Sequence, residues 1–318
     1  MRIVVVGGGS WGSTFASLLA EREHEVVLAC RDPEQAEAIA ATGRNPRYAR
    51  DADLSRVAAR PLTEAGIGSA DLVCLAVPSC AFREVAEALP GAAPVLALAK
   101  GLDPATGGRL SETVRGRPVA VLSGPNHAEE IALGKPALAV VASDDESLAS
   151  EIQHAIMSLR FRVYVNPDLA GVELCAAAKN VIGLAAGGVD GLEAGDNAKA
   201  ALITRGLAEI TRLGLACGAR PETFAGLAGM GDLVVTCWSH HGRNRLAGEL
   251  IARGASPEEA LRRVGTVVEG VTTAPVLREL GRGLGLELPI TEAVCAVLDG
   301  VSIRDLDSSL MGRRPIKE

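Results

Sequence analysis

The sequence predicts an α/β protein, in which an N-terminal Rossmann-type doubly wound sheet (residues 1–166) is followed by an all-α C-terminal domain (residues 167–318). Two observations support this prediction. The first 19 residues contain a β-branched run, a glycine-rich turn and the start of an amphipathic helix, which is how a nucleotide-binding βαβ unit begins. Short apolar runs then alternate with helical patterns to about residue 166, and beyond it the periodicity is helical almost throughout.

The glycine-rich turn directly follows the predicted strand Arg2–Val6, and its residues Gly7, Gly9 and Gly12 match the pattern G-x-G-x-x-G. The first glycine permits the turn, the second lets the backbone approach a pyrophosphate, and the third lets helix pack on strand. Free N–H groups at the helix start attract phosphates. A glycine-rich turn without a ligand is the alternative, but the strand and helix around it favour a dinucleotide site.

The second predicted strand, Glu25–Cys30, ends at Arg31 and Asp32. An acidic residue about 20 positions after such a turn commonly binds the ribose of NAD, and an arginine can bind the 2′-phosphate of NADP. Because both residue types are present, strict NAD specificity does not follow. Asp32 is at least as well suited to cap the helix that begins at Pro33.

The remaining strands of the predicted sheet are short apolar runs. They are Ala70–Val77, Val95–Ala99, Val119–Leu122, Ala137–Ala142 and Phe161–Val165, with helices over Ser79–Leu89 and from Glu146 to about Leu159, and a polar surface excursion over Thr42–Pro61.

Lys100 and the loop Ser123–Glu130 each follow one of these strands. Ligands of parallel sheets bind in the crevice at the carboxyl ends of the strands. The loop would border this crevice with small residues and backbone amides. The position of Lys100 does not by itself decide between a functional and an ordinary lysine.

The second domain begins with a predicted helix, Gly171–Ala186, that is apolar nearly all round and has Lys179 in its middle. Lysine is seldom buried without a partner, and burial lowers its pKa so that it can transfer protons near neutral pH. A lysine that reaches solvent from the helix edge is the alternative. A long amphipathic helix, Asn197–Cys217, follows.

Two polar loops interrupt this domain. Asp232 lies in a glycine-rich bend, which is more often a turn than a catalytic element, although glycines also permit close approach to a substrate. The stretch from Trp238 to Arg245 contains arginines that could bind an anion. The adjacent His240 and His241 lack the spacing of metal ligands, and we predict no metal site.

Composition limits the class of protein. The net charge is −7 without a basic stripe, which argues against nucleic acid as a partner. Seven scattered cysteines, mostly in apolar runs, indicate buried reduced thiols. We expect no signal peptide, because the N-terminus itself forms the first predicted strand, and we expect no apolar run to reach membrane-spanning length. We expect a soluble cytoplasmic protein with no stable membrane insertion, whose tail from Ser302 frays.

Several short motifs follow one another along the chain. They are GGGSWG (7–12), VPS (77–79), AKGL (99–102), SGP (123–125), AAKNVIG (177–183), ALITRGLAE (201–209), GMGDL (229–233), GRNR (242–245) and VVEG (267–270). In this order they closely resemble the motifs of bacterial-type NAD(P)-dependent glycerol-3-phosphate dehydrogenases, from residue 1 to about residue 300. The resemblance implies NAD or NADP (NADH or NADPH) as cofactor and the reversible reduction of dihydroxyacetone phosphate to sn-glycerol 3-phosphate.

The resemblance also implies roles for individual residues. Lys179 matches the catalytic acid–base lysine, Lys100 a second lysine near substrate and cofactor, and Asp232 an acid that would hold Lys179 in place. Substrate-binding positions would be Lys100, Gly124, Asn126, Asn180, Asp232, Thr236, Gly242, Arg243 and Asn244, with Arg243 and Asn244 at the phosphate. Cofactor-binding positions would be Gly7, Gly9, Ser10, Trp11, Gly12, Arg31, Tyr48, Lys100, Ala128, Arg243, Val267 and Glu269.

Two places depart from the pattern of this family. Gly242 stands where serine is usual, and Asn126-His127 replaces the commoner Thr/Ser-Phe. Activity is still expected, because the lysines, the acid and the arginine are present. The alternatives are a sibling dehydrogenase, such as a ketopantoate reductase or a β-hydroxyacid dehydrogenase, and a non-catalytic nucleotide sensor. The family suggests a homodimer and the supply of glycerol 3-phosphate for membrane phospholipids.

Overall fold

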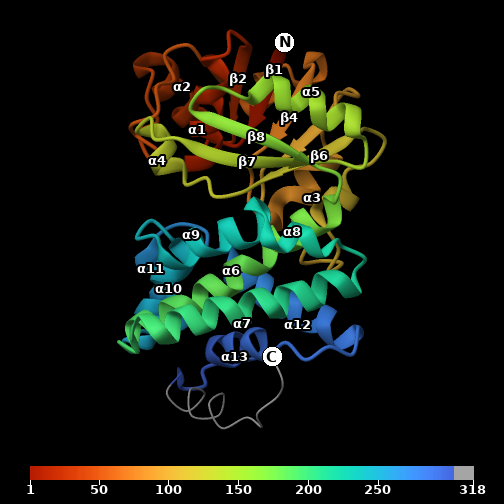
Figure 1. Ribbon diagram of the computed structural model, residues 1–318. Coiled ribbons are helices and arrows are strands. Elements are labelled where there is room, and N and C mark those ends of the chain that lie inside the picture. The colour runs from red at the N-terminus through yellow and green to blue at the C-terminus, as the bar shows by residue number, and fades with distance from the viewer. Residues whose placement is uncertain (304–318) are drawn as a thin grey trace.

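A computed structural model describes residues 1–303 of the chain (Figure 1). A sheet-containing domain lies above a helical domain in this view, and the N-terminus is at the far end of the upper one. The fraying predicted from Ser302 onward falls, beyond its first two residues, outside the described residues. The predicted fold class, a Rossmann-type sheet followed by helices, is confirmed.

The sheet has eight strands in the order β3-β2-β1-β4-β5-β6-β7-β8. They are β1 (Arg2–Val6), β2 (Glu25–Cys30), β3 (Ala58–Pro61), β4 (Leu72–Leu75), β5 (Val95–Ala97), β6 (Val119–Ser123), β7 (Ala137–Ala142) and β8 (Phe161–Asn166). All neighbours are parallel except β6 and β7, which are antiparallel. The chain therefore reverses direction after the loop that follows β6, and this loop lies at the carboxyl ends of the strands.

One strand was not predicted. The stretch assigned to a surface excursion ends in β3, a four-residue edge strand that pairs with β2. Only one of its residues, Ala59, is buried, so the run lacks the continuous apolar character that marks the central strands.

Helices cover both faces of the sheet. They are α1 (Ser10–Ala20), α2 (Pro33–Thr42), α3 (Ser79–Glu87), α4 (Ala128–Ala132) and α5 (Glu146–Ile156). Along β1, Ile3 and Val5 pack into an apolar cluster with α1, α2 and α5. Val4 and Val6 pack into the cluster on the opposite face, with α3 and the start of the helical domain. Burial on both faces explains why the central strands are almost purely apolar.

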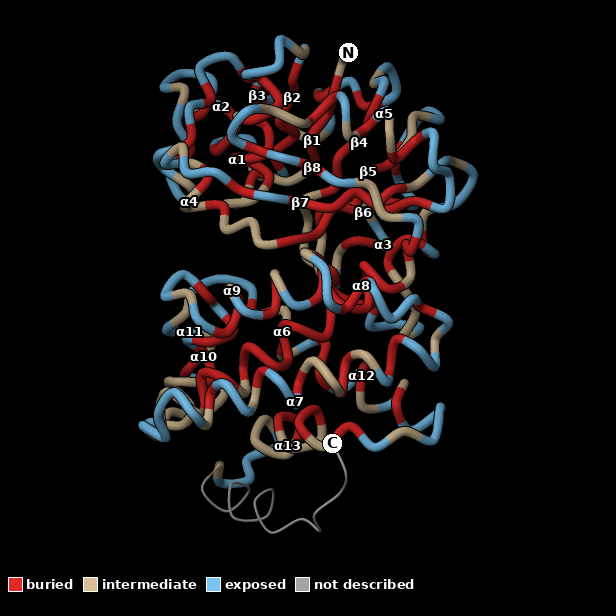
Figure 2. Tube along the Cα trace, viewed as in Figure 1, coloured by how far each residue is buried: buried red, intermediate tan, exposed pale blue. Residues whose placement is uncertain are grey.

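The helical domain surrounds α6 (Leu169–Gly191), which Figure 2 shows as buried along most of its length. The other helices are α7 (Gly195–Ala216), α8 (Pro221–Ala225), α9 (Asp232–Trp238), α10 (Arg243–Ala252), α11 (Pro257–Val264), α12 (Glu269–Gly283) and α13 (Pro289–Leu298). At the crossing of α6 and α10, a Cβ on Gly187 would lie 1.8 Å from the carbonyl oxygen of Arg245. The absence of a side chain there lets the two backbones touch.

By length and composition, α6 could cross a membrane: it has 23 residues and a mean hydropathy of 1.4 in its most apolar window. The prediction that no apolar run reaches such a length is therefore wrong. However, 89% of that window is buried inside the protein, so α6 is the core helix of this domain.

The seven cysteines are all free thiols, as predicted. Five of them are buried, whereas Cys217 is half-buried and Cys80 is exposed.

Candidate active site

A cluster of charged and polar side chains lies where the carboxyl ends of the strands meet the helical domain. Lys100 lies beyond the end of β5, Lys179 is in the middle of α6, and Asp232 begins α9. Although Lys100 and Asp232 are separated by 132 positions, they are hydrogen-bonded to each other. The fold thus brings together three residues that the sequence could only place in separate motifs.

Lys179 is held by two acceptors from α9. Its Nζ donates to Asp232 Oδ1 at 2.6 Å and to Thr236 Oγ1 at 2.9 Å, and the residue is only 7% exposed. An ammonium group has three N–H bonds. Within residues 1–303, these two acceptors leave one N–H of Lys179 available to a ligand.

Lys100, in contrast, uses all three of its N–H bonds. Its Nζ donates to the carbonyl oxygen of Gly124 at 3.0 Å, to Asn126 Oδ1 at 2.9 Å and to Asp232 Oδ2 at 2.9 Å. One carboxylate therefore binds both lysines, one through each oxygen. This arrangement fixes Lys100 as a positive charge beside Lys179.

The electrostatics of the cluster favour proton transfer by Lys179. Burial lowers the pKa of Lys179 to about 8, and Lys100 adds to this effect while Asp232 opposes it. Although burial pushes the pKa of Asp232 upward, Lys100 and Lys179 together hold it below its ordinary value. Asp232 is therefore a carboxylate at neutral pH, and Lys179 is an unusually acidic ammonium.

Asn180 and Asn244, two of the predicted substrate-binding residues, form hydrogen bonds within the protein. Asn180 donates through Nδ2 to the carbonyl oxygen of Lys100 at 3.1 Å and accepts through Oδ1 from Asn244 at 2.9 Å. Asn244 Oδ1 accepts from the backbone N–H of Gly270 at 2.9 Å. These bonds connect α6 to the starts of α10 and α12.

The glycine-rich turn has the shape that a dinucleotide requires. Gly7 has φ of 118°, where side chains are disfavoured, and a Cβ on Gly12 would lie 1.9 Å from the carbonyl oxygen of Gly7. In front of Gly9, however, a Cβ would meet nothing within 4 Å. The turn therefore leaves open space before the uncapped N-terminus of α1, as a pyrophosphate needs.

Comparison with known families agrees with this geometry. Residues 2–149 match the N-terminal part, and residues 168–305 the C-terminal part, of NAD-dependent glycerol-3-phosphate dehydrogenase. The chain belongs to this family. It is therefore an oxidoreductase that uses NAD(P).

Curated relatives match this chain over nearly its whole length. A glycerol-3-phosphate dehydrogenase [NAD(P)+] from Moorella thermoacetica is 47% identical over 98% of this chain and 96% of its own length. One from Shouchella clausii is 43% identical, with the same coverage of both chains.

Solved structures place the dehydrogenase in the same family. Glycerol-3-phosphate dehydrogenase from Coxiella burnetii has a TM-score of 0.93 and 34% identity, covering 98% of this chain and 99% of that one. A ketopantoate reductase from Ralstonia eutropha JMP134 reaches a TM-score of 0.60 at 18% identity, covering 98% of this chain and all of that one, and shares the fold alone.

Two residues that sequence reasoning missed hold the glycine turn of the dehydrogenase. The side-chain amides of Gln35 and Asn45 both donate to the carbonyl oxygen of Gly8, at 2.7 and 2.9 Å. Asn45 is 1% exposed, and its Oδ1 accepts from the backbone N–H of Tyr48 at 3.1 Å. The deep burial of Asn45 beside the turn is what marks it as important. This burial is seen only in the structure, so the sequence alone could not identify the residue.

Arg31 and Asp32 lie where the adenosine part of the cofactor is expected to bind. Arg31 is exposed, whereas Asp32 already has partners within the protein. Asp32 caps α2 by accepting from the N–H of Glu34 at 3.1 Å, which confirms the capping interpretation. Its carboxylate also pairs with Arg47 at 2.8 Å. Arg31 is thus the freer of the two groups to meet a ligand.

The other predicted cofactor-binding residues differ in their exposure and in their contacts within the protein. Ser10 starts α1, and the ring of Trp11 packs against Phe15, with 5.5 Å between centroids. Ala128 starts α4 and Val267 is exposed. Glu269 reaches from the helical domain to cap α3, where it accepts hydrogen bonds from the N–H (3.1 Å) and hydroxyl of Ser79.

The predicted phosphate group lies at the start of α10. Arg243 is exposed and, among the described residues, its guanidinium has no hydrogen bond or ion pair. Gly242 is the N-cap of α10, and a Cβ there would lie 3.0 Å from the carbonyl oxygen of Thr236. The tight packing at Gly242 agrees with a backbone rather than a side-chain contact at this position.

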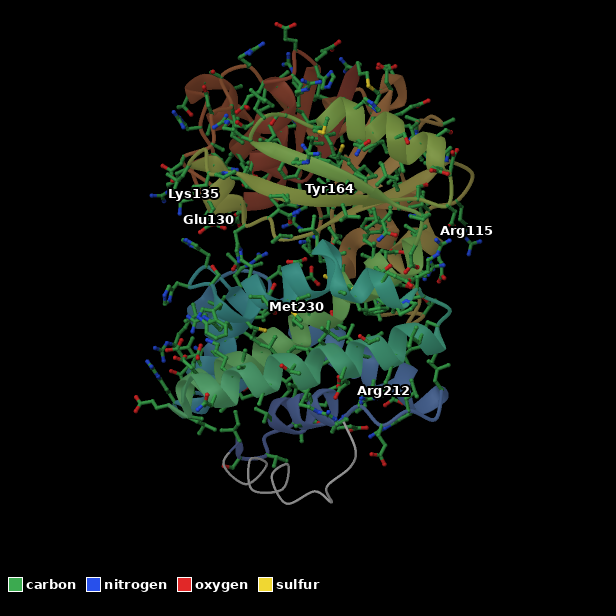
Figure 3. All side chains as sticks on the ribbon, viewed as in Figure 1. Arg115, Glu130, Lys135, Tyr164, Arg212 and Met230 are labelled. Carbon is green, nitrogen blue, oxygen red and sulfur yellow. The ribbon has the colours of Figure 1, made fainter. Side chains whose placement is uncertain are left out.

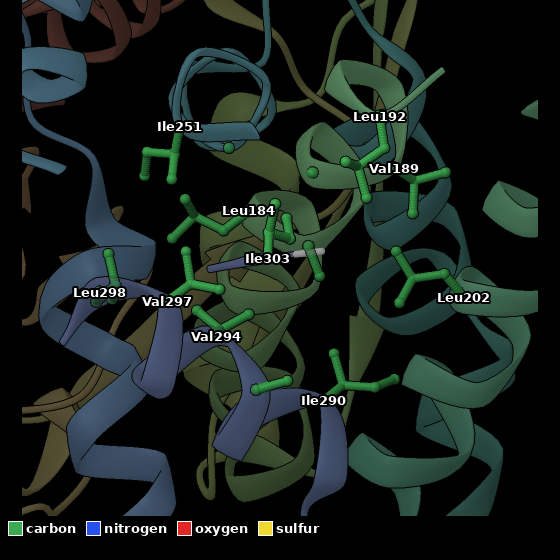
Figure 4. Close-up of a pocket in the computed structure, with 14 residues that line it drawn as sticks. Leu184, Val189, Leu192, Leu202, Ile251, Ile290, Val294, Val297, Leu298 and Ile303 are labelled. Carbon is green, nitrogen blue, oxygen red and sulfur yellow. The ribbon is translucent and has the colours of Figure 1, made fainter. Parts of the chain in front are cut away.

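A large apolar pocket lies elsewhere in the helical domain, between α6, α7, α10 and α13 (Figure 4). Its cavity volume is about 110 Å³ and it is partly open to solvent, and Leu184, Leu202, Val294 and Ile303 are among its lining residues. It contains none of the predicted site residues. Its apolar walls do not suit a small phosphorylated substrate.

Proposed function

We propose that Lys179 is the acid–base residue in the reversible reduction of dihydroxyacetone phosphate to sn-glycerol 3-phosphate. The observation that carries this proposal is the buried ammonium of Lys179, with one N–H left over beside Lys100 and Asp232. An ammonium whose pKa is about 8 is mostly protonated at neutral pH, and it releases a proton more readily than an ordinary lysine.

The reaction divides between cofactor and protein. A bound reduced nicotinamide supplies the hydride that adds to C2 of the substrate. Lys179 donates its proton to the C2 oxygen as negative charge develops there, and Lys100 contributes a second positive charge. Asp232 orients both ammonium groups. In the reverse direction, neutral Lys179 accepts the proton of the C2 hydroxyl.

The substrate phosphate binds at the start of α10 in this proposal. The guanidinium of Arg243, which has no partner in the part of the chain that the structure describes, can form two parallel hydrogen bonds to a phosphate dianion. The first N–H groups of a helix lack partners within it, so Asn244 can contribute its backbone while its side chain stays bonded to Asn180. Gly124, Asn126, Thr236 and Gly242 complete the substrate site.

Family membership supports the remaining parts of the proposal. The cofactor contacts the glycine turn, Arg31, Tyr48, Lys100, Ala128, Arg243, Val267 and Glu269. Residues 1–166 form one domain and the second begins at residue 167, with its described part ending at residue 303. The protein is a cytoplasmic homodimer that supplies glycerol 3-phosphate for phospholipid synthesis.

The test is the oxidation of reduced cofactor in the presence of dihydroxyacetone phosphate, run with NADH and NADPH in parallel. We expect turnover with at least one cofactor, and the ratio of the two kcat/KM values reports what Arg31 recognises. Dihydroxyacetone, which lacks the phosphate, is the matched control and should react at least about 100-fold less efficiently. Folded enzyme that reduces ketopantoate but not dihydroxyacetone phosphate would contradict the proposed substrate.

A further inference from the structure

Two consecutive residues in the loop between β6 and α4 have buried nitrogen atoms that lack a hydrogen-bond partner within residues 1–303. They are Asn126 Nδ2 and His127 Nε2. The orientation of the amide is determined by Lys100, which can only donate and therefore faces Asn126 Oδ1. Buried nitrogen atoms without partners are costly, so this loop would be stabilised by a ligand whose oxygen atoms accept from the Asn126 amide and, once it is protonated, from His127 Nε2.

The ring of His127 lies at the boundary between the two domains, opposite a histidine of the other domain. Its centroid is 6.2 Å from that of His241, and the ring planes are inclined by 55°. His241 comes two residues before Arg243, which begins α10. Figure 3 labels Glu130, close to His127 in sequence, on the upper domain and Met230 on the lower domain, on either side of this boundary. His127 thus approaches the start of α10 from the Rossmann domain.

Burial, together with two nearby lysines, holds the pKa of His127 below its ordinary value in the empty site. It faces Lys179 of α6, Lys100 after β5, Asp232 and the carbonyl oxygen of Val235 in α9, and the ring of His241 before α10. Burial is the largest cause that lowers the pKa of His127, and the two lysines lower it further, against Asp232 and the Val235 carbonyl. A phosphate dianion at this place would reverse the balance, because it favours the protonated ring.

We propose that His127 binds the substrate phosphate from the Rossmann domain, opposite Arg243, and takes up a proton from solvent when the dianion binds. Its Nε2–H then donates to a phosphate oxygen, beside Asn126 Nδ2. This inference rests on the proposed function, because it assumes a phosphorylated substrate at the start of α10. It adds to the phosphate site a residue that gains its charge only when the dianion binds, so that affinity for the dianion increases as the pH falls.

The test measures the binding of sn-glycerol 3-phosphate to the wild-type enzyme, His127→Phe and His127→Gln by calorimetry near neutral pH. Measurements in buffers of different ionisation enthalpy give the number of protons taken up. Titration of the ligand itself is common to all three proteins and cancels in the differences. We expect His127→Phe to weaken binding about 10- to 100-fold, as for loss of a hydrogen bond to a charged group, and to take up fewer protons than the wild type.

His127→Gln separates hydrogen bonding from charge. Glutamine keeps an N–H donor but does not titrate, so this variant should recover part of the affinity without the proton uptake. An unchanged dissociation constant for NADH shows that each variant is folded. His241→Phe is the matched control in the facing ring and should keep the proton uptake.

Two results would overturn the proposal. One is wild-type affinity together with wild-type proton uptake in His127→Phe. The other is proton uptake that persists in His127→Phe but disappears in His241→Phe, which assigns the titration to the wrong ring. Failure of the proposed function is seen separately, as the absence of dihydroxyacetone phosphate turnover in the wild type. In that case inorganic phosphate replaces sn-glycerol 3-phosphate as the probe, with the same expected and contradicting results.

Discussion

Lys179 and Lys100 lie against the same carboxylate, yet their hydrogen bonds give them different abilities. Lys100 is saturated by three acceptors within the protein, so it can supply charge but has no N–H directed to a ligand. Among the described residues, Lys179 has two acceptors and one remaining N–H. The difference in unused N–H bonds therefore supports Lys179 as the proposed proton donor and Lys100 as its electrostatic partner.

The pKa of Lys179 leads to opposite pH dependences for the two directions of the reaction. Reduction requires the ammonium, so kcat/KM with dihydroxyacetone phosphate should fall as pH rises through about 8. Oxidation of sn-glycerol 3-phosphate requires the neutral amine, so its kcat/KM should rise over the same range. Initial rates measured in both directions across this range check the prediction. A kcat/KM for reduction that stays level as the pH rises through about 8 would exclude Lys179 as the titrating group.

Removal of the amine should separate chemistry from cofactor binding. Lys179→Met keeps the length of the side chain and should lower kcat by about 100- to 10,000-fold, since general acid catalysis contributes this much. The dissociation constant for NADH should change little. Substantial remaining kcat in a folded variant would contradict the assignment.

The sequence was sufficient to propose the catalytic residues but not their arrangement. Lys179 stood out as a charge in an apolar helix, and the resemblance added Lys100 and Asp232. The pairing of Lys100 with Asp232 depends on how two domains meet, and no local pattern contains this information. His127 was noted only as a departure from the family pattern, because its unpartnered nitrogen depends on the three-dimensional surroundings.

At the level of elements, the glycine turn depends on a buried asparagine. Asn45 joins the turn, through the Gly8 carbonyl, to the segment that carries Tyr48, and it also donates to Ser13 Oγ at 2.8 Å. One side chain thereby sets the relative positions of two predicted cofactor contacts.

Asn45→Asp tests this role with a nearly isosteric change. The carboxylate keeps the acceptor for Tyr48 N–H but loses the donors to Gly8 and Ser13. We expect the dissociation constant of NADH to rise about tenfold or more, with little change in the KM for dihydroxyacetone phosphate at saturating cofactor. Fluorescence titration of NADH gives the first value and steady-state kinetics the second. Wild-type NADH affinity would show that Gln35 alone holds the turn.

The elements that the sequence predicted best are those with long, regular patterns. The predicted helices Gly171–Ala186 and Asn197–Cys217 correspond to α6 and α7, with ends that differ by a few residues. The short edge strand β3 was not predicted. The apolar run that forms β7 does not indicate that this strand is antiparallel to β6. Strand direction depends on the path of the connecting loop, which leaves no periodic signal.

In the whole molecule, a buried carboxyl group joins the two domains away from the catalytic cluster. Glu173 of α6 accepts from the N–H of Ser111 at 2.9 Å and from its hydroxyl at 2.5 Å, and it lies 3.5 Å from the guanidinium of Arg109. Burial raises the pKa of Glu173 to about 7, against the lowering effect of the Ser111 hydrogen bonds. The folded protein therefore binds this proton more tightly than the unfolded chain does.

Glu173 should make stability depend on pH. Its contribution from proton binding is complete below the ordinary pKa of 4.5 and is lost as pH rises through about 7. Glu173→Gln cannot titrate, so the Tm of the variant relative to the wild type should increase by a few degrees between about pH 5 and about pH 8. Thermal unfolding at both pH values checks this. The same Tm difference at both would refute it.

The carboxylate of Asp232 also limits how the two domains can move. Lys179 and Asp232 belong to the helical domain and move together, whereas Lys100 belongs to the other domain. Rotation of one domain away from the other must separate Lys100 from Asp232 and leave a buried carboxylate with one cation fewer. An anionic substrate offers Lys100 a replacement partner at the moment of separation. Occupancy of the site and the freedom of the domains to hinge are thus coupled through a single pair of oxygen atoms.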